Sequence, residues 1–175
     1  MSTYPLFIDN LAFARKNERL EGVLSLSDCP RLSSFLYADI TDNVTAAKAD
    51  ADIHYLLQGT IDGVGQHYLK LTIAANLTAT CQRCLHDMPI KLTLGYNYLI
   101  VDSSVNESEV NEIDSDDDVD LQEASQMMDL VALIEDEIIM AMPIAPTHDE
   151  DCSAGSMQSG DKSNPFAVLK GLIKP

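Results

Sequence analysis

The sequence predicts an α+β fold: a β-rich antiparallel sheet or partly closed barrel, covered by one amphipathic helix and with short helices at its edges. Two observations favour this class. In residues 69–81 and 90–100 an apolar residue takes almost every second position. That period is typical of strands with one buried face. After residue 129 the spacing becomes helical, which predicts a helix that covers the apolar side of the sheet.

The two alternating segments are expected to pair as a hairpin. Cys81 and Cys84 lie in the loop between them, at the tip. Pro89 has no N–H to donate to a sheet, so the second strand is predicted to begin just after it.

Shorter elements precede the hairpin. Strands are expected at residues 4–8, 22–27 and 49–58, and a glycine-bearing turn at 59–65. Short helices are expected at 10–17, with Asn10 as the N-cap, and from Pro30, with Ser27 or Asp28 as the N-cap.

The covering helix has clear end signals. Its apolar stripe consists of Leu130, Ile134, Ile138 and Ala141. Asp129 is a plausible cap and Pro143 a stop. Helical geometry places Glu137 among apolar residues, so its carboxylate must be paired or lie at the rim of the core.

Glu137 and Arg83 are candidates for an ion pair between the helix and the hairpin tip. The pair would join two segments that are far apart in the sequence. The functional alternative is an exposed Arg83 that contacts phosphate.

Charge is distributed very unevenly along the 175 residues, whose net charge is -17. Residues 1–101 carry eight basic and ten acidic side chains, whereas residues 102–161 carry eighteen acidic and no basic ones. An acidic block repels phosphate, which argues against non-specific binding of nucleic acid by the whole molecule. The block, with its run Asp116, Asp117 and Asp118, is either a solvated loop or a docking surface for a basic partner.

These observations divide the chain into two parts. Residues 1–152 are expected to form a single β-rich domain with a mobile acidic loop at 102–120. Residues 153–175 are expected to form a flexible linker and a C-terminal docking helix, because Asn164 and Pro165 can start a helix in which Phe166 and Leu169 share one side.

Cellular setting is predicted from what the sequence lacks. Four cysteines are too few and too unevenly spaced for a disulfide scaffold, and no signal peptide opens the chain. No apolar window reaches the length that a membrane span needs. A cytoplasmic protein is therefore expected, with no membrane partner and no evident small-molecule substrate.

A possible structural zinc site is the main chemical candidate. Cys81 and Cys84 are separated by two residues, a spacing that lets two thiolates reach one tetrahedral ion, and His148 and Cys152 can supply the other ligands. Two alternatives stay open. In the first, Cys81 is a small core residue and the other thiols are idle. In the second, Cys81 and Cys84 form a redox dithiol, although such motifs favour helix N-termini and strands flank this one.

Evidence for catalysis is weak, and no catalytic residue is assigned. The sequence has no phosphate-binding glycine loop and no nucleophile elbow. The basic residues Arg15, Lys16 and Arg19, together with Arg83, are candidates for RNA or partner binding. The first three can equally complement a helix dipole.

Three motifs in this order resemble the YceD family of large ribosomal RNA subunit accumulation proteins. They are the run from Cys81 to Cys84, the segment 129–143 with the following Pro146, His148 and Cys152, and the closing segment 164–169. The resemblance spans most of the chain and includes residues 9–15 and 20–26. It implies a small cytoplasmic protein without an assigned catalytic activity, and it implies no mechanism. The Asp-rich loop has no counterpart in the resemblance.

Two classes of function follow. The first is a ribosome-biogenesis factor that supports accumulation or maturation of large-subunit ribosomal RNA by binding pre-ribosomal RNA or a basic large-subunit ribosomal protein. The second is a zinc-dependent hydrolase or nuclease that uses the four Cys and His residues. A general acidic protein-interaction adaptor is a further alternative.

Overall fold

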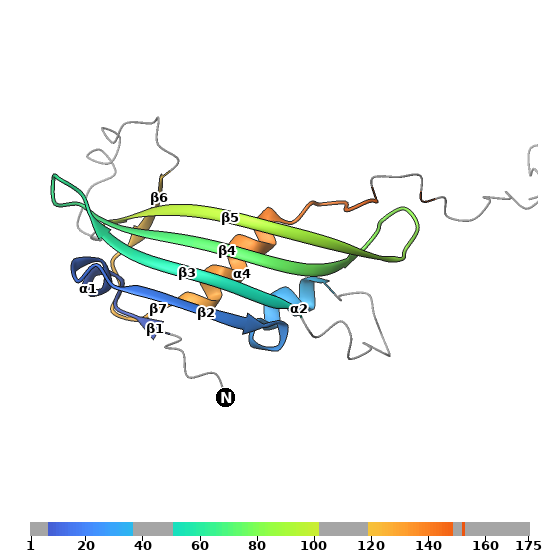
Figure 1. Cartoon of the computed structure of the whole chain (residues 1–175), viewed down its shortest axis with the longest axis horizontal. Coiled ribbons are helices and arrows are strands. Elements are labelled where there is room, and N and C mark those ends of the chain that lie inside the picture. The colour runs from blue at the N-terminus through green and yellow to red at the C-terminus, as the bar shows by residue number, and fades with distance from the viewer. Residues whose placement is uncertain (1–6, 37–50, 102–118, 149–151, 153–175) are drawn as a thin grey trace, which may run out of the picture.

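A curved sheet of five strands forms the body of the computed structural model, which describes residues 7–36, 51–101, 119–148 and 152 (Figure 1). In sheet order the strands are β2 (Arg19–Ser25), β3 (Asp52–Ile61), β4 (His67–Thr80), β5 (Asp87–Val101) and β6 (Val119–Glu123). Neighbours are antiparallel except β5 and β6, which are parallel. A second sheet pairs β1 (Phe7–Ile8) with β7 (Met128–Asp129).

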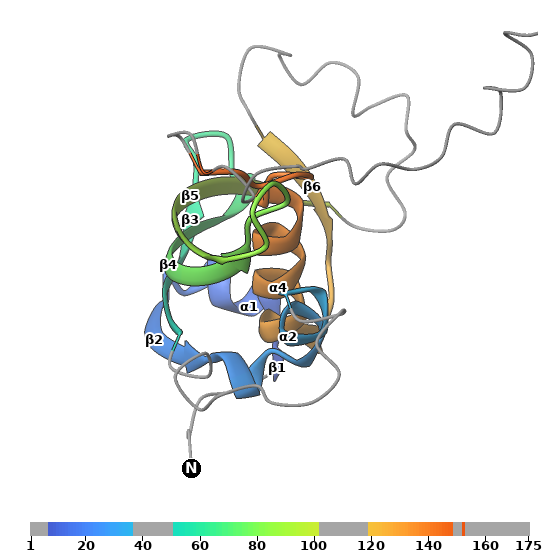
Figure 2. The same ribbon diagram turned by 90° about the vertical axis from the view of Figure 1, so that its right-hand side faces the viewer.

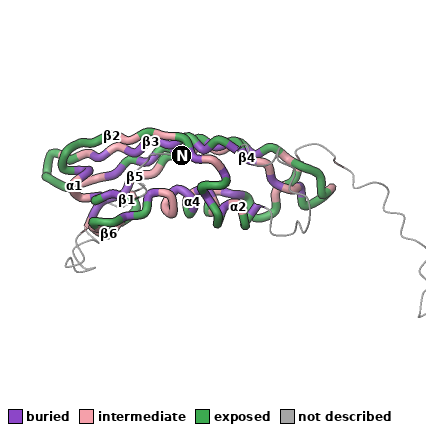
Figure 3. Tube along the Cα trace, turned by 90° about the horizontal axis from the view of Figure 1, so that it is seen from below, coloured by how far each residue is buried: buried purple, intermediate pink, exposed green. Residues whose placement is uncertain are grey.

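Helices cover one face of the large sheet. They are α1 (Asn10–Arg15), a 3₁₀ turn η1 (Leu26–Asp28), α2 (Pro30–Leu36) and α4 (Leu130–Ala141). Seen from below, α4, α2, β1 and β6 form a row on one side, opposite β2, β3 and β4 (Figure 3). The fold is therefore α+β, as predicted, and the sheet curls without closing into a barrel.

Alternation along the strands places the core between these two layers. Leu69, Leu71 and Ile73 of β4 are buried and stand beside buried residues of β3, while Lys70 and Thr72 between them are exposed. Each large apolar side chain buried in this way contributes about 1.5–3 kcal/mol.

Gly59 allows α1 to approach the sheet closely. A Cβ atom at this position would lie 2.6 Å from both the Cα of Ala14 and the carbonyl oxygen of Phe13. Because both are backbone atoms, only glycine fits here without displacing α1.

Several predicted boundaries need correction. Asp9, not Asn10, caps α1 by accepting the N–H of Ala12 at 2.8 Å. β5 begins at Asp87, before the predicted start, and Pro89 lies inside it opposite Thr78, at a part of the strand that β6 does not reach.

The Asn10 side chain has a different role from the cap that was predicted. It is fully buried, and its amide donates to the carbonyl of Glu123 at 2.8 Å and accepts the N–H of Ser125 at 2.9 Å. Asn10 therefore connects α1 to the segment after β6. The sequence around Asn10 has the pattern of a helix start. Nothing in that pattern predicts a contact with residues more than one hundred positions away.

The last two residues of the predicted acidic loop belong to a strand. Val119 and Asp120, assigned to the loop from the sequence, lie in β6. The remainder of the predicted loop, 102–118, is outside the described residues, as is the predicted tail 153–175. The division into a domain and a tail stays a prediction.

Candidate metal centre

The hairpin between β4 and β5 ends in a tight loop that presents Cys81 and Cys84. The N–H of Cys81 donates to the carbonyl of His86, and the N–H of Leu85 donates to the carbonyl of Cys81, both at 2.9 Å. Leu85 has a φ of 61°, a left-handed conformation that non-glycine residues rarely adopt. These contacts turn the backbone sharply around the two thiols.

A second segment, which follows α4, reaches this tip. The N–H of Gln82 donates to the carbonyl of Pro146 at 2.8 Å, and Nη2 of Arg83 donates to the carbonyl of His148 at 3.0 Å. The segment that follows Pro143 therefore returns from α4 to the hairpin. The tip and the end of the helix segment are side by side, as the sequence indicated.

The contact brings together all four predicted ligands. The ligand atoms of Cys81, Cys84, His148 and Cys152 lie within 4.8 Å of one another. The Sγ atoms of Cys81 and Cys152 are 3.6 Å apart, and Sγ of Cys84 is 3.5 Å from Nδ1 of His148. All of these cysteines are free thiols.

The Cys81–Cys152 and Cys84–His148 separations are close to the edges of a zinc coordination tetrahedron. With Zn–S bonds of about 2.3 Å and Zn–N bonds of about 2.0–2.1 Å, a tetrahedral site has S–S edges of about 3.8 Å and S–N edges of about 3.6 Å. Three thiolates and one imidazole are also the donor types that zinc prefers. The residues therefore fit a single four-coordinate ion.

Electrostatics favour the thiolate form of Cys81. Burial raises the pKa of this thiol, but hydrogen bonds from the backbone N–H groups of Cys84, Arg83 and His148 outweigh burial and lower the pKa from 9.0 to about 5. For Cys152, burial and its contacts with Cys81 and Cys84 raise the pKa. A thiolate that exists before the ion arrives assists metal binding, because metal ligands must be deprotonated.

A second polar cluster connects the middle of α4 to its neighbours. Glu135 is buried, and its Oε1 accepts the N–H groups of Arg31 at 2.8 Å and Leu32 at 3.0 Å. This carboxylate satisfies the first turn of α2, a role that the sequence assigned to Ser27 or Asp28. Asp136 forms an ion pair with the Arg31 side chain.

Glu137 is paired at the rim of the core, as its position on the helix predicted. Its Oε1 accepts the O–H of Tyr98 at 2.7 Å. Arg83 contacts the His148 carbonyl, and the predicted ion pair between Arg83 and Glu137 stays a prediction. Sequence reasoning missed Glu135 and Tyr98, although three consecutive acids inside an otherwise apolar helix were a visible signal.

Comparison with known proteins identifies the family. The family model described as "Large ribosomal RNA subunit accumulation protein YceD" matches residues 69–173, more than half of the chain. The chain belongs to the YceD family. A protein of Haemophilus influenzae (strain ATCC 51907 / DSM 11121 / KW20 / Rd) with that same description is 24% identical over 178 aligned residues, which cover 96% of this chain and 95% of the relative. No solved structure matches the chain.

In this member of the YceD family, two residues of the predicted basic cluster, Lys16 and Arg19, form ion pairs with acidic side chains. Nζ of Lys16 lies 3.4 Å from Oε1 of Glu18, and Nη2 of Arg19 lies 2.9 Å from Oε2 of Glu21. These ion pairs lower the local positive potential that phosphate binding would need. Arg15 is exposed at the end of α1.

Other predicted site residues of this YceD member lie outside the described part of the chain. They are Asp116, Asp117, Asp118, Asn164, Pro165, Phe166 and Leu169. None of the described helices is long and apolar enough to cross a membrane.

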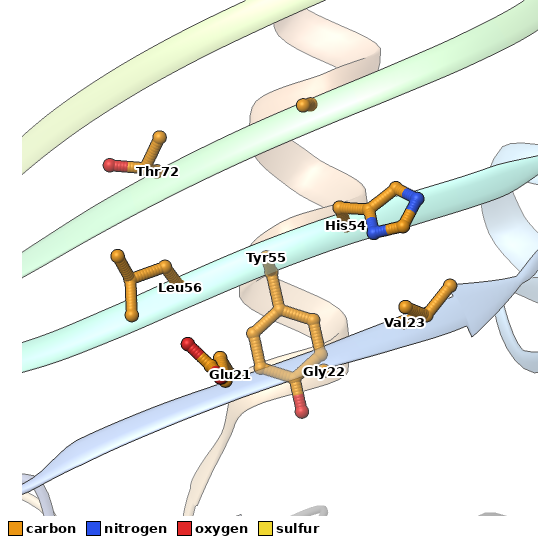
Figure 4. Close-up of a pocket in the computed structure, with 8 residues that line it drawn as sticks. Glu21, Gly22, Val23, His54, Tyr55, Leu56 and Thr72 are labelled. Carbon is orange, nitrogen blue, oxygen red and sulfur yellow. The ribbon is translucent and has the colours of Figure 1, made fainter.

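A separate hollow of about 510 Å³ lies on the solvent-facing side of the sheet (Figure 4). Glu21, His54 and Thr72 border it from three neighbouring strands, together with Val23 and Leu56. It carries one carboxylate and one imidazole on an open surface. We assign no chemistry to it, and the four-ligand cluster is the better-defined site.

Proposed function

We propose that this protein is a non-enzymatic, cytoplasmic ribosome-biogenesis factor that supports accumulation or maturation of large-subunit ribosomal RNA. Family membership is the observation that carries the proposal, since both the family and the Haemophilus relative are named for that RNA. The matched residues include α4 and all four candidate ligands.

The charge distribution supports a basic large-subunit ribosomal protein as the direct partner. Eighteen acids without a single base in residues 102–161 attract basic surfaces and repel phosphate. The ion pairs of Lys16 and Arg19 leave little positive potential for RNA. Contact with pre-ribosomal RNA is the alternative, and it would involve Arg15, Lys16, Arg19 and Arg83.

Large-subunit RNA levels in cells provide the direct test. Depletion of the protein is expected to lower the ratio of large-subunit to small-subunit ribosomal RNA, and expression of the wild-type chain is expected to restore it. An unchanged ratio on depletion would contradict the proposal. Binding of basic proteins without any effect on the ratio would instead support the general adaptor.

The partner is tested by neutralising the Asp116–Asp118 run. Changing all three to Asn is expected to weaken binding of purified large-subunit ribosomal proteins and to flatten its salt dependence, because fewer charges contribute to the attraction. Changing Glu107, Glu109 and Glu112 to Gln is the matched control, since it removes the same charge from the same block. Equal binding by the wild type and the Asn variant would discard docking through this run.

We assign one structural zinc ion to Cys81, Cys84, His148 and Cys152. Four protein ligands fill a tetrahedral shell, whereas catalytic zinc keeps an open position for water. This full shell favours the structural role over a zinc-dependent hydrolase or nuclease.

Metal analysis combined with an RNA-cleavage assay separates the two roles. Purified protein is expected to contain one zinc per chain and to leave RNA intact. RNA cleavage by the wild type that disappears in Cys84→Ser would support the nuclease instead.

A further inference from the structure

The outward face of α4 carries an exposed apolar side chain near the end of the helix. Met140 is 81% exposed, whereas Leu133 and Ile139 are partly buried and pack against the core. At about 100° per residue Met140 points away from the buried stripe of Leu130, Ile134 and Ile138. A surface helix normally has polar residues in such positions.

Neighbouring segments of the same layer also carry exposed apolar side chains. Figure 2 shows α4 outside the sheet, and in Figure 1 β6 and α2 lie on either side of it. Phe35 of α2 is 49% exposed, Leu121 of β6 is 51% exposed, and Ile144, just after α4, is fully exposed. Exposed apolar side chains gathered in one layer are typical of a surface that binds another chain.

The same layer is strongly acidic. Its exposed acids are Asp120, Glu123, Asp129 and Asp136. Among the described residues of β6, β7, α4 and α2, the single Lys or Arg is Arg31, which is already paired with Asp136. The layer is therefore expected to bind a peptide segment that is both basic and apolar.

Residues 162–175 of this chain have that character. They contain three lysines and no acid. At helical spacing Phe166, Leu169 and Ile173 share one side, and Lys170 and Lys174 lie next to each other along one edge of that side. This pattern complements an apolar surface surrounded by carboxylates.

The connection is long enough. Residues 153–163, eleven in number, follow Cys152 at the metal centre and can span roughly 36–40 Å when extended. The twelve residues of α4 extend over only about 18 Å. A linker of this length also gives an effective concentration on the order of 1 mM, so even weak docking is well populated.

We infer that the outward face of α4 is a docking surface for the chain's own segment 162–175. This inference goes beyond the proposed ribosomal role and does not depend on it. The apolar side chains of the segment cover Met140 and its neighbours, and its lysines face the surrounding carboxylates.

Photo-crosslinking in the full chain tests the inference. A benzophenone amino acid replaces Met140 in one variant and Thr72, exposed on the opposite face of the sheet, in the control. Irradiation is expected to link position 140 to residues 162–175 of the same molecule, several-fold more often than position 72. Lys170→Glu with Lys174→Glu is expected to reduce this yield, and a free peptide of residues 162–175 at about 1 mM is expected to halve it.

Three outcomes would overturn the inference. They are equal yields at positions 140 and 72, links only between two copies of the chain, and links in cells only to other proteins. A second measurement avoids the bulky probe: with methyl-labelled methionine, Phe166→Leu is expected to shift the Met140 signal through loss of the ring current, and not that of Met88 on the hairpin. An unmoved Met140 signal would also contradict docking.

Discussion

Two connections hold the α4 segment to the rest of the molecule, and they differ in what completes them. In the first, Glu135 and Glu137 accept hydrogen bonds from backbone N–H groups of α2 and from Tyr98. In the second, three thiols and an imidazole face one another at the hairpin tip. Protein groups complete the first connection, whereas the proposed zinc ion would complete the second. The centre of the fold is thus expected to be independent of metal, and its hairpin end to depend on it.

Metal removal is expected to produce the largest effect. Zinc at a thousandfold excess over its Kd would add about 4 kcal/mol to the free energy of unfolding. Urea unfolding with and without a chelator measures this difference, and Cys81→Ser is expected to abolish it.

His86→Asn is the matched control for the metal site. His86 lies in the same hairpin loop but is not one of the four clustered residues. The variant should keep the zinc-dependent stabilisation. Unfolding curves of the wild type that are insensitive to zinc would show that the second connection does not need metal.

Glu135→Ala is expected to have the next largest effect and to act independently of zinc. It leaves the N–H groups of Arg31 and Leu32 without their acceptor in the interior, at a cost of about 2–3 kcal/mol. Glu135→Gln keeps an acceptor oxygen and should lose less. Equal stability of the Ala variant and the wild type would remove this carboxylate from the first connection.

Tyr98→Phe is expected to cost about 1 kcal/mol, because it removes one hydrogen bond to Glu137. Burial and the Glu137 carboxylate raise the pKa of the Tyr98 phenol. The stabilisation is therefore complete below pH of about 10 and declines as pH rises above that value. The difference in unfolding free energy between the wild type and the variant, measured across this range, should be constant in neutral solution. A difference that grows at high pH would contradict the assignment.

Arg31→Met is expected to have the smallest effect, about 0.2–1 kcal/mol. The side chains of Arg31 and Asp136 are 50% and 57% exposed, so water and salt screen their attraction. Its stability should approach that of the wild type in high salt. A loss as large as that of Glu135→Ala would mean that the exposed pair, and not the buried carboxylate, dominates the first connection.

Much of the fold was predictable because the alternation of a strand and the spacing of a helix depend only on residues that are close together in the sequence. The alternation from residue 69 onward predicted the hairpin, and Asp129 was correctly identified as the cap of α4, where it accepts the N–H of Ala132 at 3.1 Å. The strand β6 was not predictable, because Val119 and Leu121 are embedded in acids and pair with β5 only through tertiary contact.

The candidate metal centre was predictable from residue types and spacing. The chain contains only four cysteines and four histidines, so few sets of metal ligands can be proposed from the sequence. The buried Glu135 was not predictable, because its partners belong to α2, about one hundred residues earlier in the chain. Helical geometry drew attention to Glu137 instead.

The sequence by itself determined the local elements and the chemical identity of the four candidate ligands, since both depend on neighbouring residues and on side-chain type. Only the tertiary structure decided which acids are buried and which segments meet at the hairpin tip. The physical reason is that a carboxylate can be buried only where donors from another element converge on it. That convergence is a property of packing and leaves no pattern in the local sequence.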